Sequence, residues 1–150
     1  MKTRAYLMHK NTKVFLQNHL VKLRKDLDRH ISEMGDAANH NGDLRENFAF
    51  MAKEEDTHFT KARILDLKHI LAASRIITPI KNAKKVELGT EFTIKFLQTG
   101  EQKTYILGGE QDAINFGNFY LNYKSPIAKK LKGKKEGEIV NNSVEIIKIY

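Results

Sequence analysis

The sequence predicts an α+β fold, with an N-terminal antiparallel coiled-coil hairpin of two α-helices followed by a small, mostly antiparallel β-sheet domain with one short helix. In the first half, apolar residues recur every three or four positions, and both prolines, Pro79 and Pro126, lie beyond it. In the second half, apolar and polar residues alternate in short segments between glycines and polar clusters. We therefore expect the hairpin over residues 1–77, a linker over 78–85 and the sheet domain over 86–150.

The first predicted helix carries a single apolar stripe whose members are three or four residues apart. The stripe consists of Leu16, Leu20, Leu23, Leu27, Ile31 and Met34. It ends at Gly35 and the run Asn39-His40-Asn41-Gly42-Asp43, which is rich in residues that favour turns and helix caps. We expect the chain to reverse there, with Asp43 capping the next helix.

The second predicted helix has an apolar side that we trace through Phe48, Met51, Ala52, Glu55, Phe59, Ala62 and Leu65, broadened by Ile64, Leu67 and Leu71. Two helices of roughly 28 to 32 residues would form a rod about 40 to 48 Å long. A tip that far from a globular core is typical of an arm that reaches a partner. A coiled-coil dimerisation arm explains the same pattern equally well.

Six segments of the second half are expected as strands, namely residues 86–88, 91–97, 103–107, 119–123, 138–140 and 144–150. Ser125-Pro126 has the pattern of an N-cap followed by proline at the first helical position. The short helix would run through Leu131, and Gly133 would end it.

The composition favours an anionic partner such as nucleic acid, because the formal net charge is +8 and the sequence pI is about 9.6. The absence of cysteine excludes a disulfide framework and a thiolate metal site. No stretch approaches the roughly 20 apolar residues of a membrane span, so we expect a soluble, cytoplasmic protein without a membrane partner. The six histidines show no ligand spacing and are expected at the surface.

Two carboxylates mark the predicted tip, because Asp43 and Glu46 stand three residues apart at the start of a helix and can share one ligand. In most proteins such residues only favour the positive end of the helix dipole. Their position at the end of an arm favours a functional role. Two carboxylates are too few to hold Mg²⁺ firmly, so a partner would have to supply the remaining ligands.

Three segments carry a resemblance to a known family. Gly-Asp-Leu-Arg-Glu-Asn at 42–47 resembles the GDLxEN tip motif of the bacterial Gre transcript-cleavage factors, GreA and GreB. Residues 62–67 are similar to the GRIxEL segment of the family's second helix, and residues 121–138 resemble its ISxxSPIAxALLGKxxGD signature. The resemblance extends over essentially the whole chain.

The resemblance implies an FKBP-like C-terminal domain that docks beside the secondary channel of RNA polymerase while the coiled coil enters the channel. The tip would help the polymerase cleave RNA whose 3′ end has backtracked, through Mg²⁺ shared with the polymerase. Asp43 would bind the metal, and Glu46 would assist with the metal or the attacking water. The factor would be a monomer, hold no cofactor stably by itself and have no enzymatic activity of its own. The implied docking residues are Ser125, Pro126, Ile127, Lys129 and Lys130, within a lysine run from Lys124 to Lys135.

One departure from the family pattern follows the tip, where Phe48-Ala49-Phe50 replaces the usual Ala-Glu-Tyr. Cleavage would then be weaker or differently tuned, and we expect at least one of the two phenylalanines to pack at the closed end of the hairpin. An alternative is a secondary-channel binder that inhibits transcription without stimulating cleavage. Another is a basic coiled-coil module that binds RNA or dimerises. Within the family, the high pI favours GreB-like character.

Overall fold

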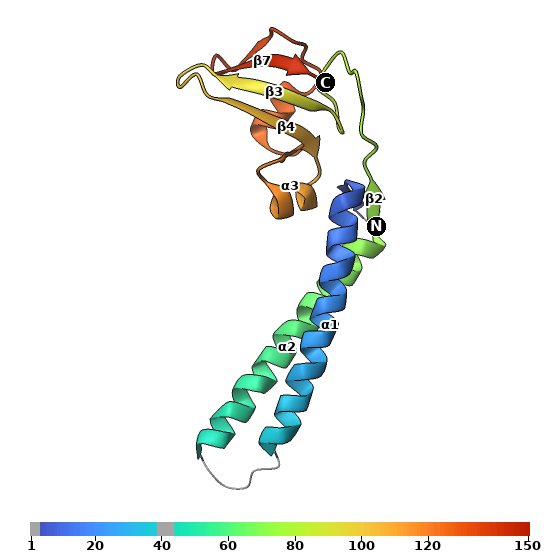
Figure 1. The fold of residues 1–150 in the computed structure, drawn as a ribbon, viewed down its shortest axis with the longest axis vertical. Helices are drawn as coiled ribbons and strands as arrows, with labels where there is room; N and C mark the ends of the chain where they lie inside the picture. Colours follow the sequence, from blue (N-terminus) through green and yellow to red (C-terminus); the bar gives the residue numbers. More distant parts are fainter. Residues whose placement is uncertain (1–3, 39–43) are drawn as a thin grey trace. The chain divides into compact units, whose positions relative to one another are not determined.

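The computed structural model describes residues 4–38 and 44–150, and for residues 44–46 it describes the backbone alone. Its elements are shown in Figure 1. The chain divides into two compact units, one made of residues 14–72 and the other of residues 1–13 together with 73–150. Residues 4–13 therefore group with the sheet.

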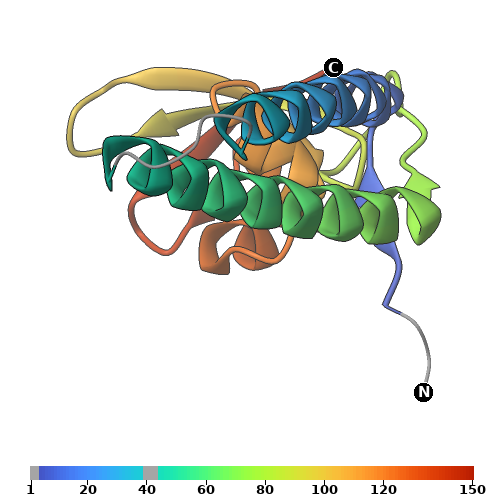
Figure 2. The same cartoon turned by 90° about the horizontal axis from the view of Figure 1, so that it is seen from below.

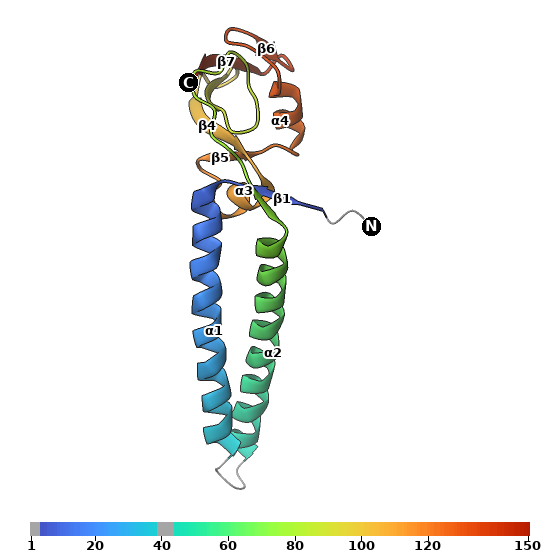
Figure 3. The same ribbon diagram turned by 90° about the vertical axis from the view of Figure 1, so that its right-hand side faces the viewer.

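The helical unit confirms the predicted antiparallel hairpin. Helix α1 spans Lys10–Ala38 and helix α2 spans Leu44–Ala72, each 29 residues long. The two helices run side by side in perpendicular views (Figures 2 and 3). The predicted stripe of α1 faces the seam, where Leu16 and Leu23 are buried, although Ile31 is 44% exposed.

The face of α2 that packs in the seam agrees with the prediction only in part. Its buried residues are Thr57, Thr60, Ile64 and Leu67, of which Ile64 and Leu67 were predicted on the apolar side. Other residues of the predicted side are exposed, with exposed fractions of 69% for Phe48, 56% for Met51, 64% for Phe59 and 66% for Leu65. Thr57 and Thr60 can be buried in the seam at little cost in free energy, because their hydroxyl groups keep hydrogen-bond partners. Each hydroxyl donates to a carbonyl one turn earlier in its own helix, at 2.8 Å in both cases.

The second unit contains a five-stranded sheet in the order β5-β4-β3-β7-β6. Its strands are β3 (Glu91–Phe96), β4 (Gln102–Gly108), β5 (Tyr120–Asn122), β6 (Ile139–Val140) and β7 (Val144–Ile149). Neighbouring strands are antiparallel except for β4 and β5, which are parallel. The mostly antiparallel sheet and five of the six expected strand segments are confirmed.

The expected strand at residues 86–88 is wrong, although Val86 is fully buried. Its N–H donates to the carbonyl of Lys134 at 2.8 Å, and its carbonyl accepts from the N–H of Gly133 at 2.7 Å. The backbone of Val86 is thus satisfied by the turn that follows the short helix, and no strand ladder forms there.

The predicted short helix is present as α4 (Pro126–Leu131), and it contributes Ala128 and Leu131 to the core. The Ser125 hydroxyl oxygen accepts the N–H of Ala128 at 3.3 Å, as expected for an N-cap. Gly133 has φ of 81°, a conformation that glycine adopts without strain after a helix.

Two features of this unit were not predicted. Helix α3 (Glu110–Phe116) is a second short helix, so the expectation of one is wrong. Strand β1 (Tyr6–Met8) pairs in parallel with β2 (Ser74–Ile76) to form a separate two-stranded sheet. The β-structure of the unit is therefore mixed.

Candidate functional site: the hairpin tip and the sheet domain

The predicted acidic tip lies at the start of α2, which begins at Leu44. Asp43 lies outside the described residues, and Glu46 falls in the first turn of α2, where only the backbone is described. Backbone N–H groups at a helix start are not used within the helix and favour negative charge. The helix start thus agrees with the predicted position of the tip, while the roles of the two carboxylates stay predictions.

The residues that follow the tip separate into two environments. Phe48 is 69% exposed, whereas Phe50 is half-buried. The expectation that at least one of them packs at the closed end of the hairpin fits Phe50.

An ion pair joins α1 and α2 near the closed end of the hairpin. Lys53 Nζ lies 2.6 Å from Glu33 Oε2. The hydrogen bond from Lys53 lowers the pKa of Glu33, so this carboxylate is charged over a wide pH range. The pair links α1 to α2.

The predicted docking residues have different environments around α4. Ser125 caps the helix and Ile127 packs against the core, so both stabilise α4 itself. Pro126, Lys129 and Lys130 are exposed. Exposure suits these three residues for contact with a partner.

The lysine run around α4 presents positive charge to solvent. Lys124 lies 3.4 Å from Glu110, and Lys134 lies 3.9 Å from Glu138. Lys130 donates to the side-chain oxygen of Asn141 at 2.9 Å. Within the described part of the chain, Lys129 and Lys132 form no ion pair, so this surface keeps a net positive charge.

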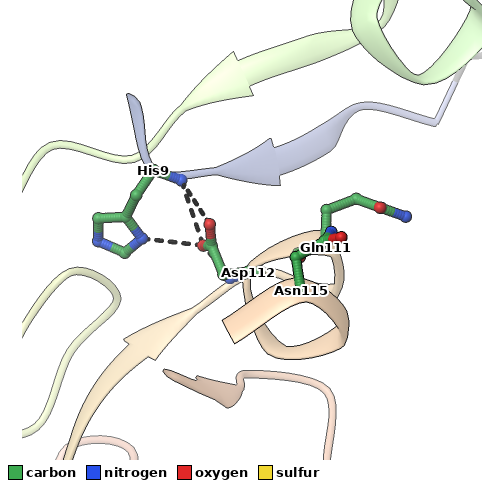
Figure 4. Close-up of polar contacts among 5 residues, drawn as sticks. His9, Gln111, Asp112 and Asn115 are labelled. Carbon is green, nitrogen blue, oxygen red and sulfur yellow. Dashed lines mark hydrogen bonds and ion pairs between the residues drawn. The ribbon is translucent and has the colours of Figure 1, made fainter. Parts of the chain in front are cut away.

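The sheet unit contains a buried polar cluster that sequence reasoning missed. Asp112 on α3 is fully buried, and His9, which precedes α1, is 5% exposed. The Asp112 carboxylate accepts the backbone N–H of His9 at 2.9 Å and the ring Nδ1–H of His9 at 2.8 Å (Figure 4). It also accepts the N–H of Gly109 at 2.8 Å. The expectation that all histidines lie at the surface is therefore wrong for His9.

The electrostatics of this cluster favour a charged carboxylate. Burial by itself would raise the pKa of Asp112, but hydrogen bonds from His9 and from the N–H of Gly109 together lower it. The ring centroids of Tyr120 and His9 lie 4.8 Å apart. Burial, together with the negative charge of the nearby Asp112, raises the pKa of Tyr120. The cluster joins the segment before α1 to α3 and β5 within one unit.

The described residues include neither a metal-binding group nor a membrane-spanning helix. Among residues 4–38 and 44–150, no group of three or more His, Asp or Glu side chains is placed to hold a metal ion. Asp43 is not among these residues. No helix in the same part of the chain is long and apolar enough to cross a membrane.

Comparisons with known proteins cover both units. Residues 6–76 match the family model described as transcription elongation factor, N-terminal, and residues 81–149 match transcription elongation factor, GreA/GreB, C-term. A transcription elongation factor GreA of Cereibacter sphaeroides is 36% identical over 122 residues, covering 80% of this chain and 77% of the relative. The chain belongs to the GreA/GreB family. A GreA of Neisseria meningitidis is 40% identical to this family member over 111 residues, with 72% and 68% of the two chains covered.

These relatives support a GreA-like elongation factor. A third relative, GreA of Wigglesworthia glossinidia brevipalpis, is 38% identical over 120 residues. The match covers 79% of this chain and 73% of the relative. The high pI by itself leaned towards GreB without deciding between the two, whereas these relatives are GreA proteins. Among solved structures, GreA factor homolog 1 (Gfh1) of Thermus thermophilus has a TM-score of 0.47 and 17% identity, with 98% of this chain and 99% of that chain covered.

Proposed function

We propose that this GreA-like factor binds RNA polymerase, inserts its hairpin tip into the secondary channel and stimulates Mg²⁺-dependent cleavage of backtracked RNA. The observation that carries the proposal is the GDLREN motif at the start of the second of two 29-residue helices, in a chain of the GreA/GreB family. At 1.5 Å per residue, each helix extends for about 44 Å, so the start of α2 lies about that far from the other end of the helix.

The tip would contribute oxygen ligands in trans. Asp43 and Glu46 offer carboxylates, which suit Mg²⁺, and leave most of its coordination positions to water, phosphate and the polymerase. The bound ion would stabilise charge and activate water in phosphodiester hydrolysis. Asp43 would bind the ion, and Glu46 would position the ion or the attacking water. By itself the factor is an accessory protein without hydrolytic activity.

The sheet domain would hold the factor on the polymerase. The exposed Pro126, Lys129 and Lys130 would contact the rim of the channel, and the lysines would favour association with acidic residues there. In this arrangement residues 14–72 would act as the arm, and the unit that contains the sheet would act as the docking domain. The protein would act as a monomer in the bacterial cytoplasm.

A cleavage assay on backtracked elongation complexes tests the proposal. The wild-type protein is expected to accelerate release of the RNA 3′ segment, whereas Asp43→Asn and Glu46→Gln abolish the acceleration and still bind polymerase. Asp28→Asn, an exposed change on α1, is the matched control and should cleave like the wild type. Unchanged cleavage by both tip variants would exclude the proposed role of the carboxylates.

A second function is favoured by the exposed Phe48 immediately after the tip motif. A bulky apolar residue at this position would suit an arm that blocks the secondary channel and inhibits synthesis. Repression of elongation without RNA cleavage would establish it. The remaining alternative, a basic coiled-coil module, predicts a stable dimer in sedimentation or tight RNA binding without polymerase.

A further inference from the structure

The outer face of α2 carries large apolar residues, although no other part of the described chain covers this face. We call it the outer stripe and define it by Phe48, Met51, Glu55, Phe59 and Ala62. Its three large apolar residues are 56% to 69% exposed. The solvent face of an amphipathic helix is normally polar, and contiguous exposed apolar patches usually mark interaction sites.

The hairpin cannot bury the outer stripe without losing its seam. Thr57, Ile64 and Leu67 already pack towards α1, and at 100° per residue they point to the opposite side of the helix. Met51, Glu55, Phe59 and Ala62 lie together on one wide, open surface along the outer side. The stripe therefore offers a contiguous, largely apolar surface to a partner.

Charge restricts the kind of partner. Glu55 lies within the stripe and Glu54 beside it, and within the described part of the chain neither has a cation within 4.0 Å. This local negative charge contrasts with the net charge of +8 of the whole protein. The surface would repel nucleic acid, and a symmetric pairing of two copies about this face would bring the Glu55 carboxylates together. An apolar surface that carries Lys or Arg side chains is complementary to it.

The position of the stripe along the arm points to the same partner as the tip. It begins four residues after the start of α2 and ends at Ala62, about 6 to 27 Å along the helix. A cavity that admits the tip to this depth also encloses the stripe. Resting on the proposed function, we infer that the outer stripe binds an apolar, Lys- or Arg-bearing protein surface of RNA polymerase that lines the path of the arm.

Binding of the full-length protein to RNA polymerase, measured by competition at fixed salt, tests the inference. Phe59→Ser should weaken binding about tenfold, because truncation of a buried aromatic side chain is among the costlier interface changes. Val21→Ser is the matched control on α1, where Val21 is 51% exposed, and should change affinity less than twofold. Cross-linking from a photoreactive residue at position 59 should identify a polymerase peptide that contains Lys or Arg.

Charge reversal provides a second test that cannot disturb the seam. Glu55→Lys should weaken binding, and the loss should diminish at high salt, whereas Asp28→Lys makes the same charge change on α1 and should bind like the wild type. Wild-type affinity for both Phe59→Ser and Glu55→Lys would overturn the inference while leaving the proposed function intact. Absence of polymerase binding by the wild type would overturn both. A dimer that Phe59→Ser dissociates would overturn the inference in favour of self-association.

Discussion

Replacing Asp112 should strongly destabilise the sheet unit, although the helix that carries this residue has only seven residues. The side chain is fully buried and accepts hydrogen bonds from two backbone N–H groups and from the His9 ring. In Asp112→Ala, the N–H groups of His9 and Gly109 and the ring Nδ1 lose their acceptor together. Since each buried donor without a partner costs about 1 to 3 kcal/mol, and neighbouring losses are not additive, we expect a loss of about 3 to 5 kcal/mol.

The second variant, Asp112→Asn, separates charge from shape. Its amide oxygen can accept one or two of the three hydrogen bonds, but its NH₂ group must face a remaining donor. The loss in free energy of unfolding should therefore lie between zero and the loss caused by Asp112→Ala. Chemical denaturation followed by circular dichroism, together with hydrogen exchange of the His9 and Gly109 amides, measures both effects. Unchanged protection of these two amides in Asp112→Ala would refute the reasoning.

The pH dependence gives an independent check. Because the pKa of Asp112 is lower in the folded state than its unfolded value of about 3.9, its stabilising contribution is fully present above that unfolded value. It is lost as the pH falls through the lower folded pKa. Wild-type protein should thus lose stability on acidification below about pH 4 more steeply than Asp112→Asn. Parallel acid profiles would show that the carboxylate is not stabilised in the folded protein.

Three further changes test the packing of the two units. Leu67→Ala, at a seam position that is 6% exposed, should lower hairpin stability by about 2 to 5 kcal/mol in thermal unfolding, whereas Leu65→Ala, at 66% exposure, should change it by less than about 0.5 kcal/mol. Gly109→Ala should loosen β1, because the added Cβ would overlap the carbonyl of Leu7, and faster amide exchange in residues 6–8 would reveal it. Ser125→Ala should cost about 0.5 to 2 kcal/mol through loss of the α4 cap, measured by denaturation.

Sequence reasoning predicted the elements whose signals are local. Alternation in residues 91–97 identifies β3, and the Ser125-Pro126 pair identifies the start of α4, because neighbouring residues determine both patterns. Turn and cap residues at 39–43 likewise predicted a second helix after them, and α2 begins at Leu44. These successes depend on features that a short window of sequence contains.

The features that were missed depend on contacts between distant residues or on very short elements. His9 and Asp112 are 103 positions apart, and nothing near either residue indicates the other. Strand β1 has three residues and pairs with β2 across the whole hairpin, so its partner cannot be inferred from periodicity. Helix α3 has seven residues, too few to establish a helical repeat.

The prediction of one broad buried side on α2 fails in part for a different reason, because this helix has apolar residues on two opposite sides. The seam uses Ile64 and Leu67 with the smaller Thr57, while the larger Phe59 and Phe48 remain outside. Burial of a phenylalanine side chain contributes about 1.5 to 3 kcal/mol, so stability of the hairpin alone would favour placing Phe59 inside. A helix with two apolar sides can pack against two partners, and α1 covers only one of these sides. The arrangement therefore favours a second protein surface against α2, which the Phe59→Ser and Glu55→Lys variants are designed to detect.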